Sequence, residues 1–116
     1  MKIRQLLCLL AIGSVPLLVV QNGLGGIQVA GAVLPGSPLV GGLALFATSY
    51  LSPGHITVTA ALPIVLGGAP GTDARVVERF AELLRDVMPV ETVESLEGAQ
   101  WTKLLINHVN ALPAIT

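Results

Sequence analysis

Hydrophobic and polar positions divide the chain into two parts at Asp73. After Lys2 and Arg4, no Asp, Glu, Lys or Arg occurs before that position. A stretch so poor in charge is either embedded in a membrane or packed on both faces, like the strands of an α/β sheet. A membrane-spanning helix needs about 20 unbroken apolar residues, and the longest apolar run, residues 6–20, is interrupted by glycine, serine and proline. The pattern therefore favours buried strands.

Glycine and proline divide this first part into short elements. Residues 4–12 predict a helix that leads into the first strand. Residues 15–20 form an apolar run followed by Gln21-Asn22-Gly23, which is typical of a buried parallel strand. The segments expected next are a helix at 27–34, extended runs at 39–50, 55–60 and 62–66, a turn at 52–54 and a glycine-rich turn at 67–71.

The first twenty residues also allow a secretory signal peptide. Lys2 and Arg4 would be its basic start and residues 6–12 its apolar segment. The cleavage site is poor, because Ala11-Ile12-Gly13 is followed by another apolar run instead of a polar mature start. We therefore favour the helix.

From Thr72 onward the hydrophobic period becomes that of a helix. Apolar residues from Val76 to Val87 recur at i, i+1, i+4, i+7, i+8 and i+11, which is one stripe of an amphipathic helix. Thr72 is expected to cap this helix, with Asp73 in its first turn and Pro89 after its end.

An edge strand at 90–93 and a second helix at 96–112 are expected to follow. This helix begins near Ser95 and is interrupted at Pro113. Its apolar surface is too large for a terminal helix with nothing packed on it, so we expect further protein after Thr116.

Three polar residues of this last helix form the most informative candidate site. Lys103, Asn107 and Asn110 fall within about 60° of one another on a helix, and apolar side chains flank them. Buried amides need partners, and a buried lysine loses its proton more easily. The alternative is a solvated polar stripe, although two asparagines inside a helix are unfavourable enough to require a reason. We expect the lysine and the amide one turn onward to face a closed crevice.

The second candidate is the segment Gln21-Asn22-Gly23-Leu24-Gly25-Gly26 after the first strand. Open α/β sheets bind ligands at such a position, beside a helix N-terminus. The alternative is a plain turn in which glycines supply positive φ. The segment is not the dinucleotide fingerprint G-x-G-x-x-G, because the third glycine would fall at Gln28, and no other window supplies it.

Composition and spacing exclude several other kinds of site. Charged residues make up only 11% of the chain, and 6 Lys+Arg against 7 Asp+Glu leave no basic surplus for binding nucleic acid. Cys8 is the single cysteine, so no internal disulfide forms, and a reducing, cytoplasmic setting is expected. His55 and His108 lack the partner spacing of a metal site. Glu91, Glu94 and Glu97 are interpreted as a solvated surface.

These features, in their order and spacing, resemble the ketopantoate reductase (2-dehydropantoate 2-reductase) family. The Trp-x-Lys-x-x-x-Asn pattern at 101–107 is fairly specific, and the Gln-Asn-Gly turn is supportive. The resemblance implies an α/β fold in which residues 1–94 are the C-terminal part of a Rossmann-like NADP-binding domain and 95–116 begin an all-α substrate domain. The stretches that carry it are 17–25, 53–55 with 65–67, 101–107 and 110–116.

The resemblance also implies an activity, the NADPH-dependent reduction of 2-oxopantoate to (R)-pantoate on the way to pantothenate and coenzyme A. Lys103 would be the general acid and Asn107 would orient the substrate, helped by Asn110, although the family often has this second asparagine one residue later. Asn22 would lie between nicotinamide and substrate, and Ala47, near the end of the next strand, would touch the cofactor. The expected partner is a small 2-oxo acid, with no nucleic acid or membrane; a homodimer stays open.

The missing glycine fingerprint departs from the family, because it would cradle the pyrophosphate of the cofactor. We therefore expect this chain alone neither to bind NADPH well nor to turn over. A related enzyme acting on another 2-oxo acid stays open. The alternatives from other classes are a noncatalytic apolar protein with a signal peptide and a degenerate interaction module.

Overall fold

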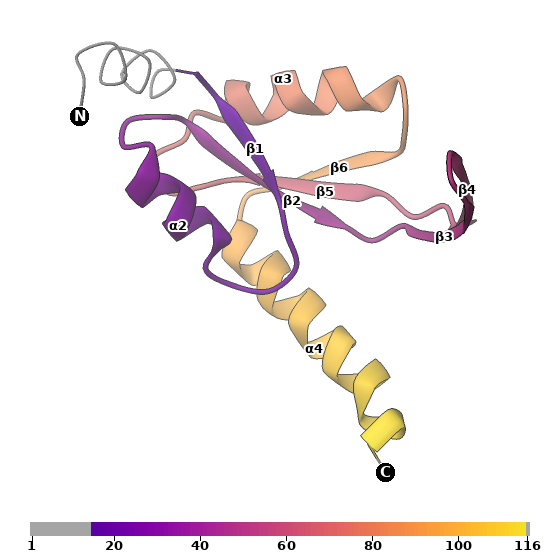
Figure 1. The fold of residues 1–116 in the computed structure, drawn as a ribbon. Coiled ribbons are helices and arrows are strands. Elements are labelled where there is room, and N and C mark those ends of the chain that lie inside the picture. The colour runs from indigo at the N-terminus through magenta and orange to yellow at the C-terminus, as the bar shows by residue number, and fades with distance from the viewer. Residues whose placement is uncertain (1–14, 116) are drawn as a thin grey trace, which may run out of the picture.

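The computed structural model describes residues 15–115 (Figure 1). The predicted helix at 4–12, the signal-peptide alternative and Cys8 lie outside these residues. The elements are β1 (Leu17–Val20), α2 (Gly26–Val33), β2 (Leu39–Ala44), β3 (Ala47–Ser52), β4 (His55–Ala60), β5 (Ile64–Gly68), α3 (Ala74–Arg85), β6 (Val90–Val93) and α4 (Leu96–Ile115).

The main sheet is mixed, with the strand order β1-β2-β5-β6. β1 pairs with β2 in parallel, as the sequence predicts, and β5 pairs with β6 in parallel, but β2 and β5 are antiparallel. β6 lies at an edge, which confirms that prediction. β1 lies at the other edge of the described sheet and is half-buried to exposed rather than buried.

β2 and β5 are antiparallel because the long extended run predicted at 39–50 consists of two strands. Leu45 and Phe46 interrupt it, and β3 then pairs with β4 in a separate two-stranded sheet. Gly54, with φ +76°, lies in the turn between them. The hairpin reverses the chain, so that β5 returns alongside β2 in the opposite direction.

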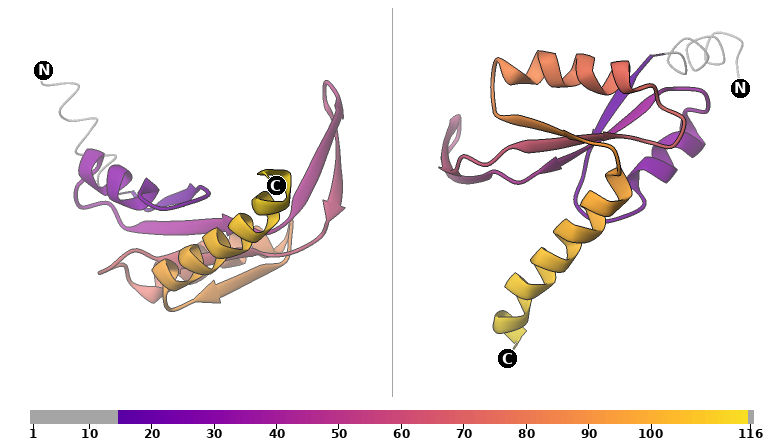
Figure 2. Two further views of the ribbon diagram at one scale, coloured as in Figure 1. Left: turned by 90° about the horizontal axis from the view of Figure 1, so that it is seen from below. Right: turned by 180° about the vertical axis from the view of Figure 1, so that it is seen from behind.

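Helices cover both faces of the main sheet (Figures 1 and 2). On one face, α3 buries Val77 and Ala81 against β2 and β5. On the other face, Ile27 of α2 and Leu96 of α4 pack with Leu39. Neighbouring residues of β2 belong to different cores, Leu39 to one and Val40 to the other, because successive side chains of a strand point to opposite faces.

Helix ends differ from the sequence prediction in two places. Asp73, not Thr72, caps α3: its carboxylate accepts a hydrogen bond from the Arg75 backbone N–H at 2.8 Å. The Thr72 hydroxyl instead donates to the carbonyl oxygen of Leu39 at 2.9 Å and ties the loop before α3 to the sheet. Pro113 does not end α4, which continues through it to Ile115.

The far part of α4 projects from the sheet (Figure 2). From Leu105 to Ile115 every residue is exposed, although several are large and apolar. Within residues 15–115, none of the helices combines the length and apolarity that a membrane crossing requires.

Candidate functional site

The turn after β1 carries the first group of predicted site residues. The backbone N–H of Gln21 donates to the carbonyl oxygen of Gly42 at 3.3 Å, which continues the pairing of β1 with β2. Gly23 and Gly25 have φ values of +79° and +95°, conformations that other residues adopt only with strain. The Gln21 side chain lies where a Cβ at Gly26 would be, so the missing side chain at the start of α2 leaves room for it. Asn22 is exposed in this turn.

Lys103 lies in the half-buried part of α4. Its Nζ donates a hydrogen bond to the carbonyl oxygen of Ala44, the last residue of β2. Partial burial removes water from the ammonium and lowers the pKa of Lys103 below its ordinary value. The group is therefore a better proton donor than a lysine in open solvent.

The register of the sheet places Lys103 and Asn22 at the same end of strands β1 and β2. Val20 is the partner of Gly42 in the parallel pair β1–β2. Asn22 follows Val20 by two residues, and Ala44 follows Gly42 by two residues, so both lie where these two strands end. Because Lys103 binds Ala44, the ammonium approaches the carboxyl ends of β1 and β2, where open α/β sheets bind ligands.

Asn107 and Asn110 lie farther along α4 than Lys103 does. Asn107 and Asn110 are exposed on the projecting part of α4, as are the flanking apolar residues Leu105 and Val109. Lys103 and Asn107 were expected to face a closed crevice, but Lys103 is only half-buried and Asn107 is exposed. Ala47 is exposed and begins β3, three residues after the end of β2, because the run from 39 divides before it.

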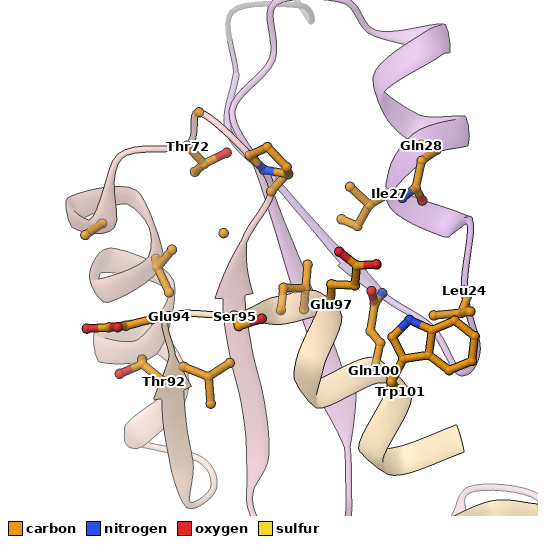
Figure 3. Close-up of a pocket in the computed structure, with 18 of the residues that line it drawn as sticks. Leu24, Ile27, Gln28, Thr72, Thr92, Glu94, Ser95, Glu97, Gln100 and Trp101 are labelled. Carbon is orange, nitrogen blue, oxygen red and sulfur yellow. The ribbon is translucent and has the colours of Figure 1, made fainter. Parts of the chain in front are cut away.

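A large cleft opens between α2, α3 and α4 (Figure 3). Its volume is about 900 Å³, and its walls come from the start of α2, the loop before α3 and the start of α4. Neither Lys103 nor Asn22 is among its lining residues, so it is not the closed crevice expected around the lysine. Among residues 15–115, no three His, Cys, Asp or Glu side chains gather as metal ligands would.

The sequence analysis missed this cleft. Glu94 and Glu97 line it, but their spacing indicates only a solvated surface. The glycine-rich segment 67–71 was the available signal, since a glycine-rich loop between a strand and a helix often borders a ligand site.

Comparison with solved structures identifies similar folds. The chain is similar to 2-dehydropantoate 2-reductase from Methylococcus capsulatus, with a TM-score of 0.65 and 25% sequence identity over 78% of this chain. It is also similar in fold to a structure assigned as a 2-dehydropantoate 2-reductase from Enterococcus faecalis, with a TM-score of 0.57 and 21% identity over 92% of this chain. The chain is related to the ketopantoate reductase family.

This relationship confirms the resemblance inferred from the motifs at 17–25 and 101–107. The matched region covers 29% of the Methylococcus protein and 36% of the Enterococcus protein, so the chain spans about a third of their length. No family model matches the sequence, and no curated protein matches it. The fold supports the coarser expectation, a mixed α/β sheet with helices on both faces.

Proposed function

We propose that this chain carries part of a 2-oxo acid reductase site of the ketopantoate reductase type, namely the part at which the carbonyl group is reduced. The observation that supports this proposal is the position of Lys103, whose ammonium is held at the end of β2 beside the end of β1. A partly desolvated lysine next to a turn rich in amides suits the binding and reduction of an anionic carbonyl compound. The proposed substrate is 2-oxopantoate, and the proposed setting is cytoplasmic.

The residues present fit only one end of the proposed cofactor, NADPH. The side-chain amides of Gln21 and Asn22 can donate to and accept from a neutral carboxamide such as that of nicotinamide. A pyrophosphate instead needs a cradle of backbone N–H groups or cations, and the sequence lacks the G-x-G-x-x-G fingerprint. The bound cofactor would supply the hydride; Asn22 and, from the start of β3, Ala47 would lie against its nicotinamide end.

In this proposal Lys103 provides the proton. When the carbonyl carbon is reduced, negative charge develops on the carbonyl oxygen, and the ammonium transfers a proton from Nζ to that oxygen. The products are a hydroxyl group on the substrate and a neutral amine on Lys103. The lowered pKa favours this transfer, and the positive charge before transfer attracts the substrate carboxylate. Asn107, one turn along α4, would orient the substrate, with Asn110 beyond it.

Binding of 2-oxopantoate to the ¹⁵N-labelled chain, followed by amide NMR, tests the proposal without requiring turnover. We expect saturable shifts centred on Asn22, Gly23 and Lys103. Lys103→Ala should abolish them and Lys103→Arg should keep most of them, because arginine retains the charge. Arg79→Ala, an exposed cation on α3, is the matched control and should leave them unchanged. Equal shifts in wild type and Lys103→Ala, or shifts centred elsewhere, would contradict the proposal.

A further inference from the structure

The large cleft is not lined by the proposed reaction residues Lys103 and Asn22. Lys103 binds Ala44, whose partner in β5 is Ile64, the first residue of that strand. The cleft extends from Leu24 and Trp101 to Gly68, the last residue of β5, which is paired with Val40. Four residues separate these pairs, or about 13 Å at the rise of a strand. The cleft therefore extends well away from the contact of Lys103 with Ala44, toward the other end of the strands.

The cleft has the size and the walls of a small-molecule site. Its volume of about 900 Å³ lies within the range of about 300–1,000 Å³ that is usual for ligand pockets. Ile27, Val77 and Leu96 supply apolar surface from three different helices. In Figure 3 the indole of Trp101 lies beside Leu24 at the border of the cleft. Because Trp101 is 48% exposed, the indole offers a face on which a ligand can stack.

Three side chains of α4 meet at this wall. Glu97, Gln100 and Trp101 are spaced at i, i+3 and i+4, so they lie on one face of the helix (Figure 3). A carboxylate, an amide and an aromatic ring are thus presented together. An organic cation that lay against the ring would be attracted by its π electrons as well as by the carboxylate.

All the charged residues that line the cleft are acidic. Glu78, Glu94 and Glu97 line the cleft, and none of its lining residues is Lys, Arg or His. Arg85 forms an ion pair with Glu78 from outside the cleft. Within residues 15–115, the side-chain carboxylates of Glu94 and Glu97 have no hydrogen-bond or ion-pair partner. Such a lining repels phosphates and carboxylates, including the pyrophosphate of a dinucleotide, and favours a cation.

We propose that this cleft binds a small organic cation, a primary amine or guanidinium attached to an apolar or aromatic body. The cationic group binds Glu97, the apolar body packs on Trp101 and the side chains behind it, and Glu94 adds to the negative potential of the cleft. The lining of the cleft does not include Lys103 or Asn22, although Leu24 and Trp101, which do line it, are each two residues from one of them in the chain.

Trp101 is the only tryptophan of the chain, so its fluorescence reports directly on the cleft. The probe is 2-phenylethylamine, compared with its neutral analogue 2-phenylethanol and its anionic analogue 3-phenylpropionate. We expect a saturable change in emission with the amine, binding at least about tenfold weaker with the alcohol and none with the carboxylate. Added salt should weaken binding of the amine.

Matched glutamine variants test which carboxylates contribute to binding of the amine. Glu97→Gln should weaken binding of the amine about fivefold, and the double variant Glu94→Gln/Glu97→Gln should weaken it further. Glu91→Gln, on the exposed part of β6 outside this cleft, is the control and should have no effect. The amide NMR shifts that 2-oxopantoate causes around Lys103 should persist in all of these variants. This result separates the present proposal from the reductase proposal.

Several results would overturn the proposal. These are the absence of saturable binding, equal binding of the amine and the alcohol, and equal effects of Glu97→Gln and Glu91→Gln. Shifts of the Gln28 and Gln100 side-chain amides in NMR spectra provide a second readout that does not depend on fluorescence. If the amine binds but these amides do not shift, the ligand lies elsewhere and the assignment to the cleft is wrong.

Discussion

Gly41 of β2 is paired with Gly67 of β5, and Leu96 packs directly over both of them. A Cβ at Gly41 would come within 2.7 Å of both terminal methyl carbons of Leu96. A Cβ at Gly67 would lie 2.9 Å from the Cβ and 3.1 Å from the Cα of Leu96. The absence of two side chains thus lets the start of α4 approach the sheet, and this approach allows Lys103 to reach Ala44.

Alanine substitutions at this pair should separate side-chain from backbone clashes. Gly41→Ala and Gly67→Ala should each destabilise the fold by about 1–3 kcal/mol, the usual cost of overpacking. In a Leu96→Ala background the cost of Gly41→Ala should largely disappear, because the clashing methyl groups are gone, whereas that of Gly67→Ala should remain. Urea unfolding of the single and double variants measures these costs.

Gly31→Ala is the control: its Cβ would lie 3.4 Å from Leu39, and it should stabilise α2 by up to about 1 kcal/mol. Equal rescue at both glycines would contradict this account of the packing.

The lowered pKa of Lys103 predicts a stability that increases in alkaline solution. Between its folded pKa and the value of about 10.4 in an unfolded chain, the unfolded state holds more protons than the folded state. The free energy of unfolding therefore rises with pH in this window. Urea unfolding midpoints of wild type and Lys103→Met, measured from neutral pH to about pH 10, should diverge in favour of wild type. A difference that shrinks as pH rises would show that the lysine pKa is not lowered.

The Asp73 cap predicts a loss of stability in acid. Hydrogen bonds from Arg75 lower the pKa of Asp73, so the carboxylate stabilises the fold above its unfolded pKa of about 3.9, and this stabilisation is lost as pH falls through the folded pKa. Asp73→Ala should lower Tm by several degrees at neutral pH, and the difference from wild type should narrow in acid. Thermal unfolding followed by circular dichroism measures both effects. Asp86→Ala, at the other end of α3, should not destabilise, because a negative charge is unfavourable there.

The contact of Gln21 with Gly26 predicts a variant that alters the turn after β1 without unfolding the protein. A Cβ at Gly26 meets the end of the Gln21 side chain, which can rotate away. Gly26→Ala should therefore leave stability unchanged or raise it by up to about 1 kcal/mol, while the side-chain amide signals of Gln21 shift in NMR spectra. The double variant Gln21→Ala/Gly26→Ala should be as stable as Gln21→Ala or slightly more so. Destabilisation by more than about 1 kcal/mol would mean that the backbone, not the side chain, is in contact.

Local patterns in the sequence predicted most of the elements. The helical period from Val76 to Val87 and the apolar runs between turns correspond to α3 and to the strands, because burial of one face or both faces leaves a periodic trace. The errors lie where local rules compete. Thr72 and Asp73 are both good capping residues, and tertiary contact decided between them, because the Thr72 hydroxyl binds Leu39 in the sheet. The division of the run from 39 to 50 was missed, because both halves are extended.

The candidate site was predictable in its parts but not as an arrangement. The Trp-x-Lys-x-x-x-Asn pattern and the Gln-Asn-Gly turn are visible in the chain, since each depends on a few neighbouring residues. A closed crevice was expected around Lys103 and Asn107, yet the structure buries Lys103 partly and leaves Asn107 exposed, as it does Asn110. Spacing along a helix defines a shared face, but the length of sheet beneath the helix determines how much of that face is covered.

The sequence by itself therefore determined most of the elements, their order and the relationship to the reductases, because hydrophobic period, turns and short motifs are properties of neighbouring residues. Only the tertiary structure decided that Lys103 meets Ala44, 59 residues earlier in the chain, and that a cleft lined by carboxylates opens between α2, α3 and α4. Both depend on strand register and on how closely α4 crosses Gly41 and Gly67. These distances between remote segments are fixed by packing and leave no local pattern.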